Sequence, residues 1–217
     1  ANLIINGGTL NLYTDDDGIH SDGILTINGG NIIISNSYEG IEGNYIYFKN
    51  GTVQIKSQDD GINAKTTLYF EGSDVYLDAG GDGLDSNGNI YMSAGVVLAL
   101  GPTNGGNGVI DYGDRNCTFS FTGGLLLAIG CSGMNAKPTG TTGNTVSATS
   151  ISASVNSYLT ISSNGKIVAV LKVAKSNQNY QVFAYNNSDY PQANISIQSS
   201  YSGTLVNGLM YYTNSLS

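Results

Sequence analysis

The chain has 217 residues, enough for one domain or for one large domain with a small appendage. Residues 1–114 carry 15 acids against three lysines, a net charge of −12, whereas the remainder carries +4. So acidic a first half argues against a nucleic-acid partner, because phosphates need a basic surface. No apolar run approaches the roughly 20 residues of a membrane span, so we expect none.

One short unit recurs along the first 130 residues. Its anchor glycine returns at intervals of 22, 21, 22 and then 25 residues: Gly18, Gly40, Gly61, Gly83 and Gly108. The longer last interval indicates a loop insertion near residues 102–107. The segment NLIINGG at 2–8 matches ILTINGG at 24–30, so we expect the chain to begin inside a repeat.

Each repeat holds three short apolar-alternating segments separated by Gly, Asn or Asp, which are typical of strands and too short for helices. A unit of about 22 residues with three strands is one coil of a right-handed parallel β-helix, an all-β fold whose coils stack about 4.8 Å apart. Alternation directs these residues inward: Leu10/Leu12, Ile32/Ile34, Val53/Ile55 and Val75/Leu77 on the first strand; Ile19, Ile41, Ile62, Leu84 and Val109 on the second; Leu3/Ile5, Leu25/Ile27, Ile46/Phe48, Leu68/Phe70, Ile90/Met92 and Phe119/Phe121 on the third.

The pattern breaks after Thr139. We assign residues 1–144 to the β-helix and 145–217 to an irregular C-terminal β-rich segment that caps or continues it, because an open end would expose unpaired strands. A separate small β-sandwich is the alternative. Strands are expected at 158–161, 167–173, 180–184, 195–197 and 205–212, with a hairpin turn at Asn164-Gly165. Cys117 and Cys131 permit one disulfide, and two buried thiols are the equal alternative.

Acidic residues gather at one corner of the coil. Two columns are expected, one before the anchor glycine (Asp17, Glu39, Asp60, Asp82) and one two positions after it (His20, Glu42, Asn63, Asp85). Carboxylates about 5 Å apart repel one another unless a cation intervenes. Ca²⁺ accepts six to eight oxygen ligands, and zinc is poorly served by one His and two distant Cys. We therefore predict Ca²⁺ ligands among Asp16, Asp17, Asp22, Glu39, Glu42, Asp59, Asp60, Asp82, Asp85 and Asp111; a solvated acidic face is the alternative.

Tyrosines recur on the outward side of the third strand. Tyr47, Tyr69 and Tyr91 are 22 residues apart and should stack on an exposed flat face. There they would bind sugar rings through their apolar area and polar tips, or serve as a purely structural ladder. Tyr13 and Tyr76 are expected to point outward on the first strand.

The segments DDDGIHSDG, YEGIEGN, DDGINAK and GDGLDSNGN, each followed by a short strand and a glycine turn, carry a family resemblance over residues 2–139. The chain resembles the secreted carbohydrate-binding β-helix proteins of cellulose-degrading anaerobic bacteria, which are similar in structure to pectate-type polysaccharide lyases. The resemblance implies several bound calcium ions and binding of cellulose and of acidic sugars such as polygalacturonate, without lyase activity. It places the calcium role on Asp16, Asp17, Glu39, Asp59, Asp60 and Asp82, with Glu42 and Asp85 behind them. The second copy departs from the pattern, with Tyr38-Glu39 in place of two aspartates.

We therefore expect a secreted or cell-surface, monomeric, non-catalytic protein that binds calcium and plant cell-wall polysaccharide. A calcium-dependent uronate lyase is one alternative, and it needs a base such as Lys65 or Arg115. A lysine among carboxylates has a raised pKa, the wrong direction for a base. A structural cell-surface solenoid is the other alternative.

Overall fold

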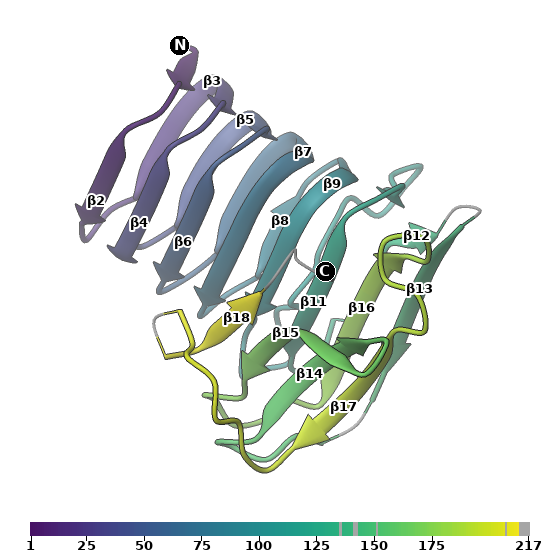
Figure 1. Ribbon diagram of the computed structural model, residues 1–217. Helices are drawn as coiled ribbons and strands as arrows, with labels where there is room; N and C mark the ends of the chain where they lie inside the picture. The colour runs from purple at the N-terminus through teal and green to yellow at the C-terminus, as the bar shows by residue number, and fades with distance from the viewer. Residues whose placement is uncertain (135, 141–142, 151, 207, 213–217) are drawn as a thin grey trace.

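The computed structural model describes residues 1–134, 136–140, 143–150, 152–206 and 208–212, which form strands, turns and loops (Figure 1). No membrane-spanning helix occurs in these ranges. The strands are β1 (Leu3–Ile5), β2 (Thr9–Tyr13), β3 (Ile19–Ile27), β4 (Asn31–Asn36), β5 (Ile41–Phe48), β6 (Thr52–Ser57), β7 (Ile62–Ala79), β8 (Leu84–Ser86), β9 (Asn89–Leu100), β10 (Phe119–Phe121), β11 (Leu125–Gly130), β12 (Thr139–Gly140), β13 (Asn144–Thr149), β14 (Tyr158–Ser163), β15 (Lys166–Lys172), β16 (Tyr180–Asn186), β17 (Asn194–Gln198) and β18 (Met210–Tyr212).

Parallel pairing between successive coils produces three faces. The flank face comprises β2, β4, β6, residues 74–79 of β7, residues 96–100 of β9, and β11. The acidic face comprises residues 19–21 of β3, 41–43 of β5, 62–64 of β7, and β8. The tyrosine face comprises β1, residues 24–27 of β3, 45–48 of β5, 67–70 of β7, 89–92 of β9, β10 and β12. The all-β parallel β-helix with three strands per coil is therefore confirmed.

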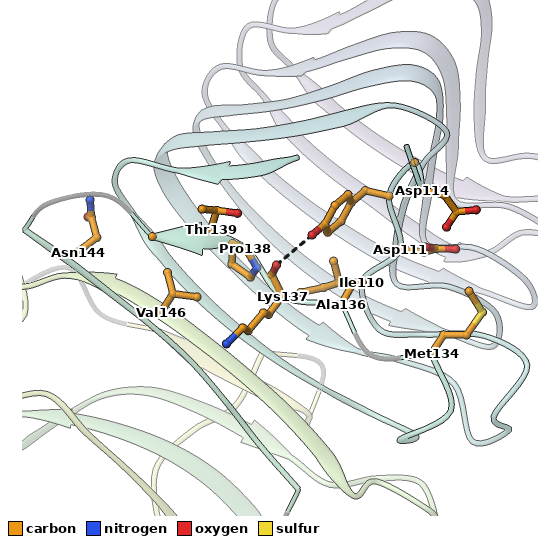
Figure 2. Close-up of a pocket in the computed structure, with 13 residues that line it drawn as sticks. Ile110, Asp111, Asp114, Met134, Ala136, Lys137, Pro138, Thr139, Asn144 and Val146 are labelled. Carbon is orange, nitrogen blue, oxygen red and sulfur yellow. Dashed lines mark hydrogen bonds between the residues drawn. The ribbon is translucent and has the colours of Figure 1, made fainter. Parts of the chain in front are cut away.

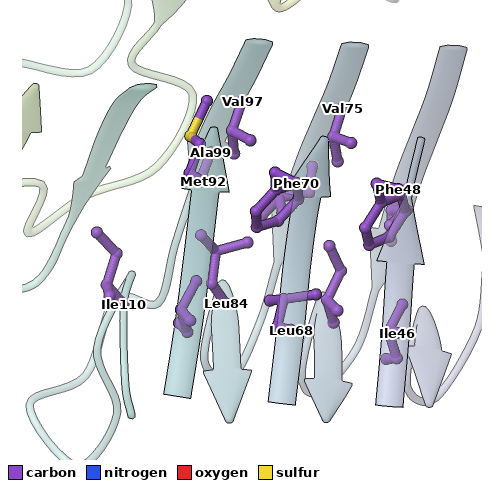
Figure 3. Close-up of a cluster of buried hydrophobic side chains, with 14 of the residues drawn as sticks. Ile46, Phe48, Leu68, Phe70, Val75, Leu84, Met92, Val97, Ala99 and Ile110 are labelled. Carbon is purple, nitrogen blue, oxygen red and sulfur yellow. The ribbon is translucent and has the colours of Figure 1, made fainter. Parts of the chain in front are cut away.

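The core consists of ladders of like residues between the three faces (Figure 3). Ile46, Leu68 and Ile90 are fully buried in register, and the Phe48 and Phe70 rings stack with centroids 5.2 Å apart. In the first coil, Leu3, Ile5, Leu10 and Leu12 pack against this core but are only partly buried. Because side chains alternate along a strand, the period-2 pattern is sufficient to assign the inward set.

The anchor glycines lie where successive coils approach most closely. A Cβ atom on Gly18 would stand 2.6 Å from the Gly40 carbonyl oxygen and 2.7 Å from the Ile34 Cγ2. The prediction that Gly108 continues this series is wrong by one residue, because Leu84 bridges to Ile110 and the Leu84 N–H donates to the Val109 carbonyl. Ile110 therefore continues the second inward ladder, with Val109 buried beside it. The insertion shifts the register, which spacing alone does not reveal.

The C-terminal segment both caps the helix and covers its flank. β16 pairs antiparallel with β11, and β13 pairs with β16, so the flank sheet continues past the last coil. Tyr180, Val182 and Ala184 of β16 face the solenoid core. The hairpin at Asn164-Gly165 forms with both residues at positive φ, as a two-residue turn requires. β18 begins only at Met210, later than expected, after a turn in which Gly208 has φ of 70°.

A second antiparallel sheet, β17-β14-β15-β18, packs on the outer side of the flank face. Its apolar residues form a second core with outward residues of the later coils, including Leu98 and Leu127. This sheet covers Tyr76, which is 9% exposed, whereas Tyr13 on an uncovered coil is 77% exposed. Tyr76 therefore points outward from the solenoid core, as expected, but the second sheet buries it. The division of the chain into residues 1–144 and 145–217 stays a prediction.

Lys175 joins the C-terminal segment to the flank. Its Nζ donates to the main-chain carbonyls of Ala79 (2.5 Å) and Gly101 (3.0 Å) and lies 2.6 Å from Asp78 Oδ1. The two cysteines, Cys117 and Cys131, are free thiols.

Candidate functional site

The strand register stacks acidic residues of successive coils in two columns on the acidic face. In the first column, the N–H groups of Gly18, Gly40 and Gly61 donate at 2.8–2.9 Å to the main-chain carbonyls of the next coil's Glu39, Asp60 and Asp82. In the second column, the register pairs His20, Glu42, Asn63 and Asp85 in succession. Asp111 extends this column, since its neighbour Ile110 bridges to Leu84. Residues about 22 positions apart thus become lateral neighbours.

The end of the columns at the first two coils is partly balanced by cations. His20 Nδ1 lies 3.0 Å from Asp17 Oδ2 and 2.6 Å from Glu42 Oε2, and its Nε2 lies 3.3 Å from Asp22 Oδ1. Lys65 Nζ lies 2.7 Å from the other Glu42 oxygen. Hydrogen bonds to Asp17 and Asp22 raise the pKa of His20, and the bond to Glu42 raises that of Lys65. The histidine and two of its partners, Asp17 and Glu42, also lie close enough to hold a metal ion, and His20 and Lys65 offset only part of the charge of Asp17, Asp22 and Glu42.

The following coils carry a group without such balance, which we call the carboxylate cluster: Glu39, Asp60, Asp82, Asp85 and Asp111. Within the described part of the chain none of the five forms an ion pair. Burial raises the pKa of Glu39 and Asp85 to about 7, and that of Asp60 and Asp82 to about 6. Burial, and then the neighbouring Asp114, raises the pKa of Asp111. For Asp85, repulsion from the cluster's other carboxylates adds to the effect of burial.

The carboxylate cluster offers oxygen donors of the kind that a hard cation accepts, although among the described residues the group with three ligand atoms within 4.8 Å is Asp17, His20 and Glu42. Glu39 Oε2 and Asn63 Oδ1 are buried without a hydrogen-bond partner, while the Asn63 amide donates to Glu39 Oε1 at 3.2 Å. Asp60 and Asp82 each use one oxygen to accept a main-chain N–H, from Asp82 at 2.8 Å and from Gly108 at 2.5 Å. A buried oxygen without a donor is costly in an apolar setting. Carboxylate and amide oxygens from adjacent coils are the donor set that Ca²⁺ accepts.

The ten predicted calcium ligands therefore do not form one group. Five belong to the carboxylate cluster, and Asp17, Asp22 and Glu42 are paired with His20 or Lys65. Asp59 borders the cluster and accepts a hydrogen bond from the Tyr38 hydroxyl, which raises the pKa of Tyr38. Asp16 is exposed on the turn before the first anchor glycine.

The three tyrosines stack on the tyrosine face as the spacing predicts. Tyr47 and Tyr69 have ring centroids 4.4 Å apart and nearly parallel planes, and Tyr69 and Tyr91 are 5.2 Å apart. Tyr69 thus has both ring faces covered, and the ladder presents ring edges and hydroxyls to its surroundings. Lys49 Nζ lies 5.6 Å from the Tyr47 centroid. Beside the ladder, Tyr45 pairs with Ile24 and Thr67 and is 39% exposed.

An open groove of about 850 Å³ lies where the acidic face ends (Figure 2). Residues 110–114, which follow the last strand of that face, form one side, and Met134, residues 136–140, Asn144 and Val146 form the other. The Tyr112 hydroxyl donates to the Lys137 carbonyl at 3.5 Å across the groove, and the Tyr112 ring meets Phe119 edge-on. Sequence reasoning missed this groove because the repeat ends here; the interrupted spacing after Gly83 was the available signal.

The fold and these surfaces define a β-solenoid with a stacked acidic face, an aromatic face and an open groove at its capped end. The chain belongs to the family of carbohydrate-binding domain-containing proteins, whose model matches residues 1–43 and 33–183. No curated protein and no solved structure matches the chain significantly. The second match spans both the carboxylate cluster and the groove.

Proposed function

We propose that the chain is a secreted or cell-surface, non-catalytic, calcium-binding protein that binds plant cell-wall polysaccharides, namely cellulose and acidic sugars such as polygalacturonate. Family membership establishes the carbohydrate-binding class. The carboxylate cluster carries the proposal of calcium, because one buried oxygen within it, Glu39 Oε2, and one beside it, Asn63 Oδ1, have no hydrogen-bond donor. Bound there, the ion would offset part of the cluster's negative charge and leave coordination positions for a sugar carboxylate.

The tyrosine face is the proposed surface for a neutral polymer. Its hydroxyls recur once per coil along the solenoid axis, and they can both donate to and accept from sugar hydroxyls. The Tyr45 ring has no aromatic neighbour in its own ladder, so its face is available to the apolar side of a sugar ring. Tyr91, at the end of its stack, is 37% exposed. Together they give an amphipathic strip on a flat sheet.

The chemistry around Lys65 supports a binding role over lyase activity. Lyase chemistry needs a neutral base, but Lys65 Nζ lies 2.7 Å from Glu42 and its pKa is raised by that contact. Arg115, the other candidate, is exposed to solvent.

Sedimentation with insoluble polysaccharide tests the proposal. The protein is mixed with microcrystalline cellulose or calcium-pectate gel, in Ca²⁺ or in chelator, and bound protein is measured. We expect cellulose binding in both conditions and pectate binding only with Ca²⁺. Tyr45→Ala with Tyr91→Ala should reduce cellulose binding at least about tenfold, whereas the exposed pair Tyr13→Ala with Tyr38→Ala serves as the control.

Two results would overturn the proposal. Failure to bind either polymer would leave a structural solenoid. Release of an unsaturated uronide that absorbs in the ultraviolet, abolished by Lys65→Ala or Arg115→Ala, would establish the lyase alternative.

A further inference from the structure

The groove beyond the acidic face is built from residues that neither the carboxylate columns nor the tyrosine ladder uses, apart from Asp111. Ile110, Ala136, Pro138 and Val146 supply apolar surface, and the Tyr112 ring lies among them. Its volume of about 850 Å³ lies in the range of small-molecule sites, which run from about 300 to 1,000 Å³. The lining of the groove is more polar than apolar, which suits a hydroxyl-rich ligand.

The polar groups divide between the two sides of the groove. Figure 2 shows the Asp111 and Asp114 carboxylates on one side, and Lys137 and Asn144 on the other. The carboxylates can accept hydrogen bonds from ligand hydroxyls, and the Lys137 ammonium can donate to them. This arrangement suits a ligand that both donates and accepts along its edge and has a C–H face for the apolar residues. Sugars have this chemistry.

The charge of the groove favours a neutral sugar. Two carboxylates against one ammonium give its rim a net negative charge, and residues 1–114, which include both carboxylates, carry −12. A uronate would meet repulsion here unless a cation were bound. A neutral hexose unit would meet none and could use the Asp114 carboxylate as an acceptor, whether or not Asp111 binds calcium.

We propose that this groove binds one or two units of a neutral polysaccharide chain, as a second glycan site separate from the tyrosine face and independent of calcium. The inference rests on the proposed carbohydrate-binding function, and the family match over residues 33–183 includes every residue of the groove. The occupant is a soluble neutral oligosaccharide or a short stretch of polymer, held by Asp114 and Lys137 over the Tyr112 ring.

The test is titration of the isotope-labelled whole chain with cellotetraose in chelator, followed by two-dimensional NMR and calorimetry. Amide shifts should concentrate at residues 110–114 and 136–146. The double variant Asp114→Asn with Lys137→Met should weaken binding at least about tenfold, because both substituted side chains are exposed and folding should not suffer. The control Asp15→Asn with Lys166→Met makes the same charge changes at exposed positions elsewhere and should bind as the native chain does.

Tyr112→Phe provides a second variant that keeps the ring and removes the bond to Lys137; it should retain most of the affinity, whereas Tyr112→Ala should lose it. Shifts confined to the tyrosine face, or equal affinity of the double variant and its control, would overturn the groove proposal while leaving polymer binding intact. Tighter binding of an oligogalacturonate than of cellotetraose in chelator would also overturn it. Absence of binding to any oligosaccharide or polymer would remove the proposed function as well.

Discussion

Replacing Asp85 by asparagine should change the stability of the protein in opposite directions with and without calcium. Asp85 lies in the middle of β8 on the acidic face, in register with Asn63 and beside Asp111. Burial and the neighbouring Asp60 and Asp82 raise its pKa to about 7. In chelator at pH 8, Asp85 is therefore ionised in an environment that favours its protonated form, and this ionisation destabilises the folded state.

The size of the effect follows from that pKa. A rise from 3.8 to about 7 corresponds to an upper limit of about 4 kcal/mol, and partial exposure and solvent screening reduce it to about 1–2 kcal/mol. The amide has nearly the same shape without the charge, so in chelator the melting temperature should rise by about 2–8 °C. Calcium at about 100 times its dissociation constant should stabilise the native chain by about 2.7 kcal/mol, or about 5–11 °C. Asp85→Asn should lose at least half of that gain.

The assay is thermal unfolding by circular dichroism at pH 8, in chelator and across a calcium titration. Asp189→Asn removes the same charge from an exposed position in the C-terminal segment, and it should leave both melting temperatures within about 2 °C. If Asp85→Asn lowers the melting temperature in chelator, the electrostatic account of the cluster is wrong. If calcium stabilises the variant as much as the native chain, Asp85 is not a ligand.

Other predictions concern pH, packing and the C-terminal clamp. In chelator, the free energy of unfolding should fall as pH rises from 5 to 8. The raised carboxylate pKa values of 6 to 7 make the folded state bind more protons than the unfolded state in this window. Urea titrations at each pH measure the free energy of unfolding, and a profile that does not change with pH contradicts the prediction. Gly40→Ala should destabilise the chain by about 2 kcal/mol or more in urea unfolding, because its Cβ would overlap the Gly61 carbonyl and the Ile55 methyl. Gly29→Ala is the control substitution, because Gly29 does not have a positive φ and its Cβ would make an ordinary contact with the Asn6 carbonyl oxygen at 3.4 Å. Lys175→Met should lower the free energy of unfolding, measured in urea, by about 2 kcal/mol, because it leaves Asp78 and two main-chain carbonyls without their donor. Adding Asp78→Asn to this variant should recover part of the lost stability.

The repeating part of the fold was predictable because several local rules agree. Alternation fixes which side chains face inward, and the glycine spacing fixes the length of a coil, so these two rules alone place Phe48 and Phe70 in one ladder. The rules fail where the coil length changes. The longer segment after Gly83 allows two registers one residue apart, and only the Leu84–Ile110 bridge decides between them.

The acidic columns were also predictable, but their division into acids paired with a base and acids without one was not. Column membership follows from coil spacing, whereas charge balance depends on where long side chains reach. Lys65 lies just outside the second column and contacts Glu42 of the preceding coil. His20 occupies a column position and pairs with acids before, after and one coil above it. These contacts leave the unpaired negative charge on the later coils. The repeat pattern in the sequence does not distinguish the acids of the later coils from those of the first two.

In the tyrosine ladder, the same repeat that places the tyrosines on one surface also limits how many ring faces a sugar can reach. Identical spacing brings Tyr47, Tyr69 and Tyr91 into register, and the same register brings their rings within 4.4–5.2 Å, so each ring covers its neighbour. A sugar can stack only on an aromatic face that no other ring occupies. On this side of the solenoid such faces belong to tyrosines that have a non-aromatic neighbour in their ladder. Tyr45 lies between Ile24 and Thr67, and Tyr91 lies at the end of its stack beside Ser120. Sugar stacking should therefore depend on the breaks in the aromatic pattern, and the interior of the regular ladder should contribute hydroxyls and rigidity.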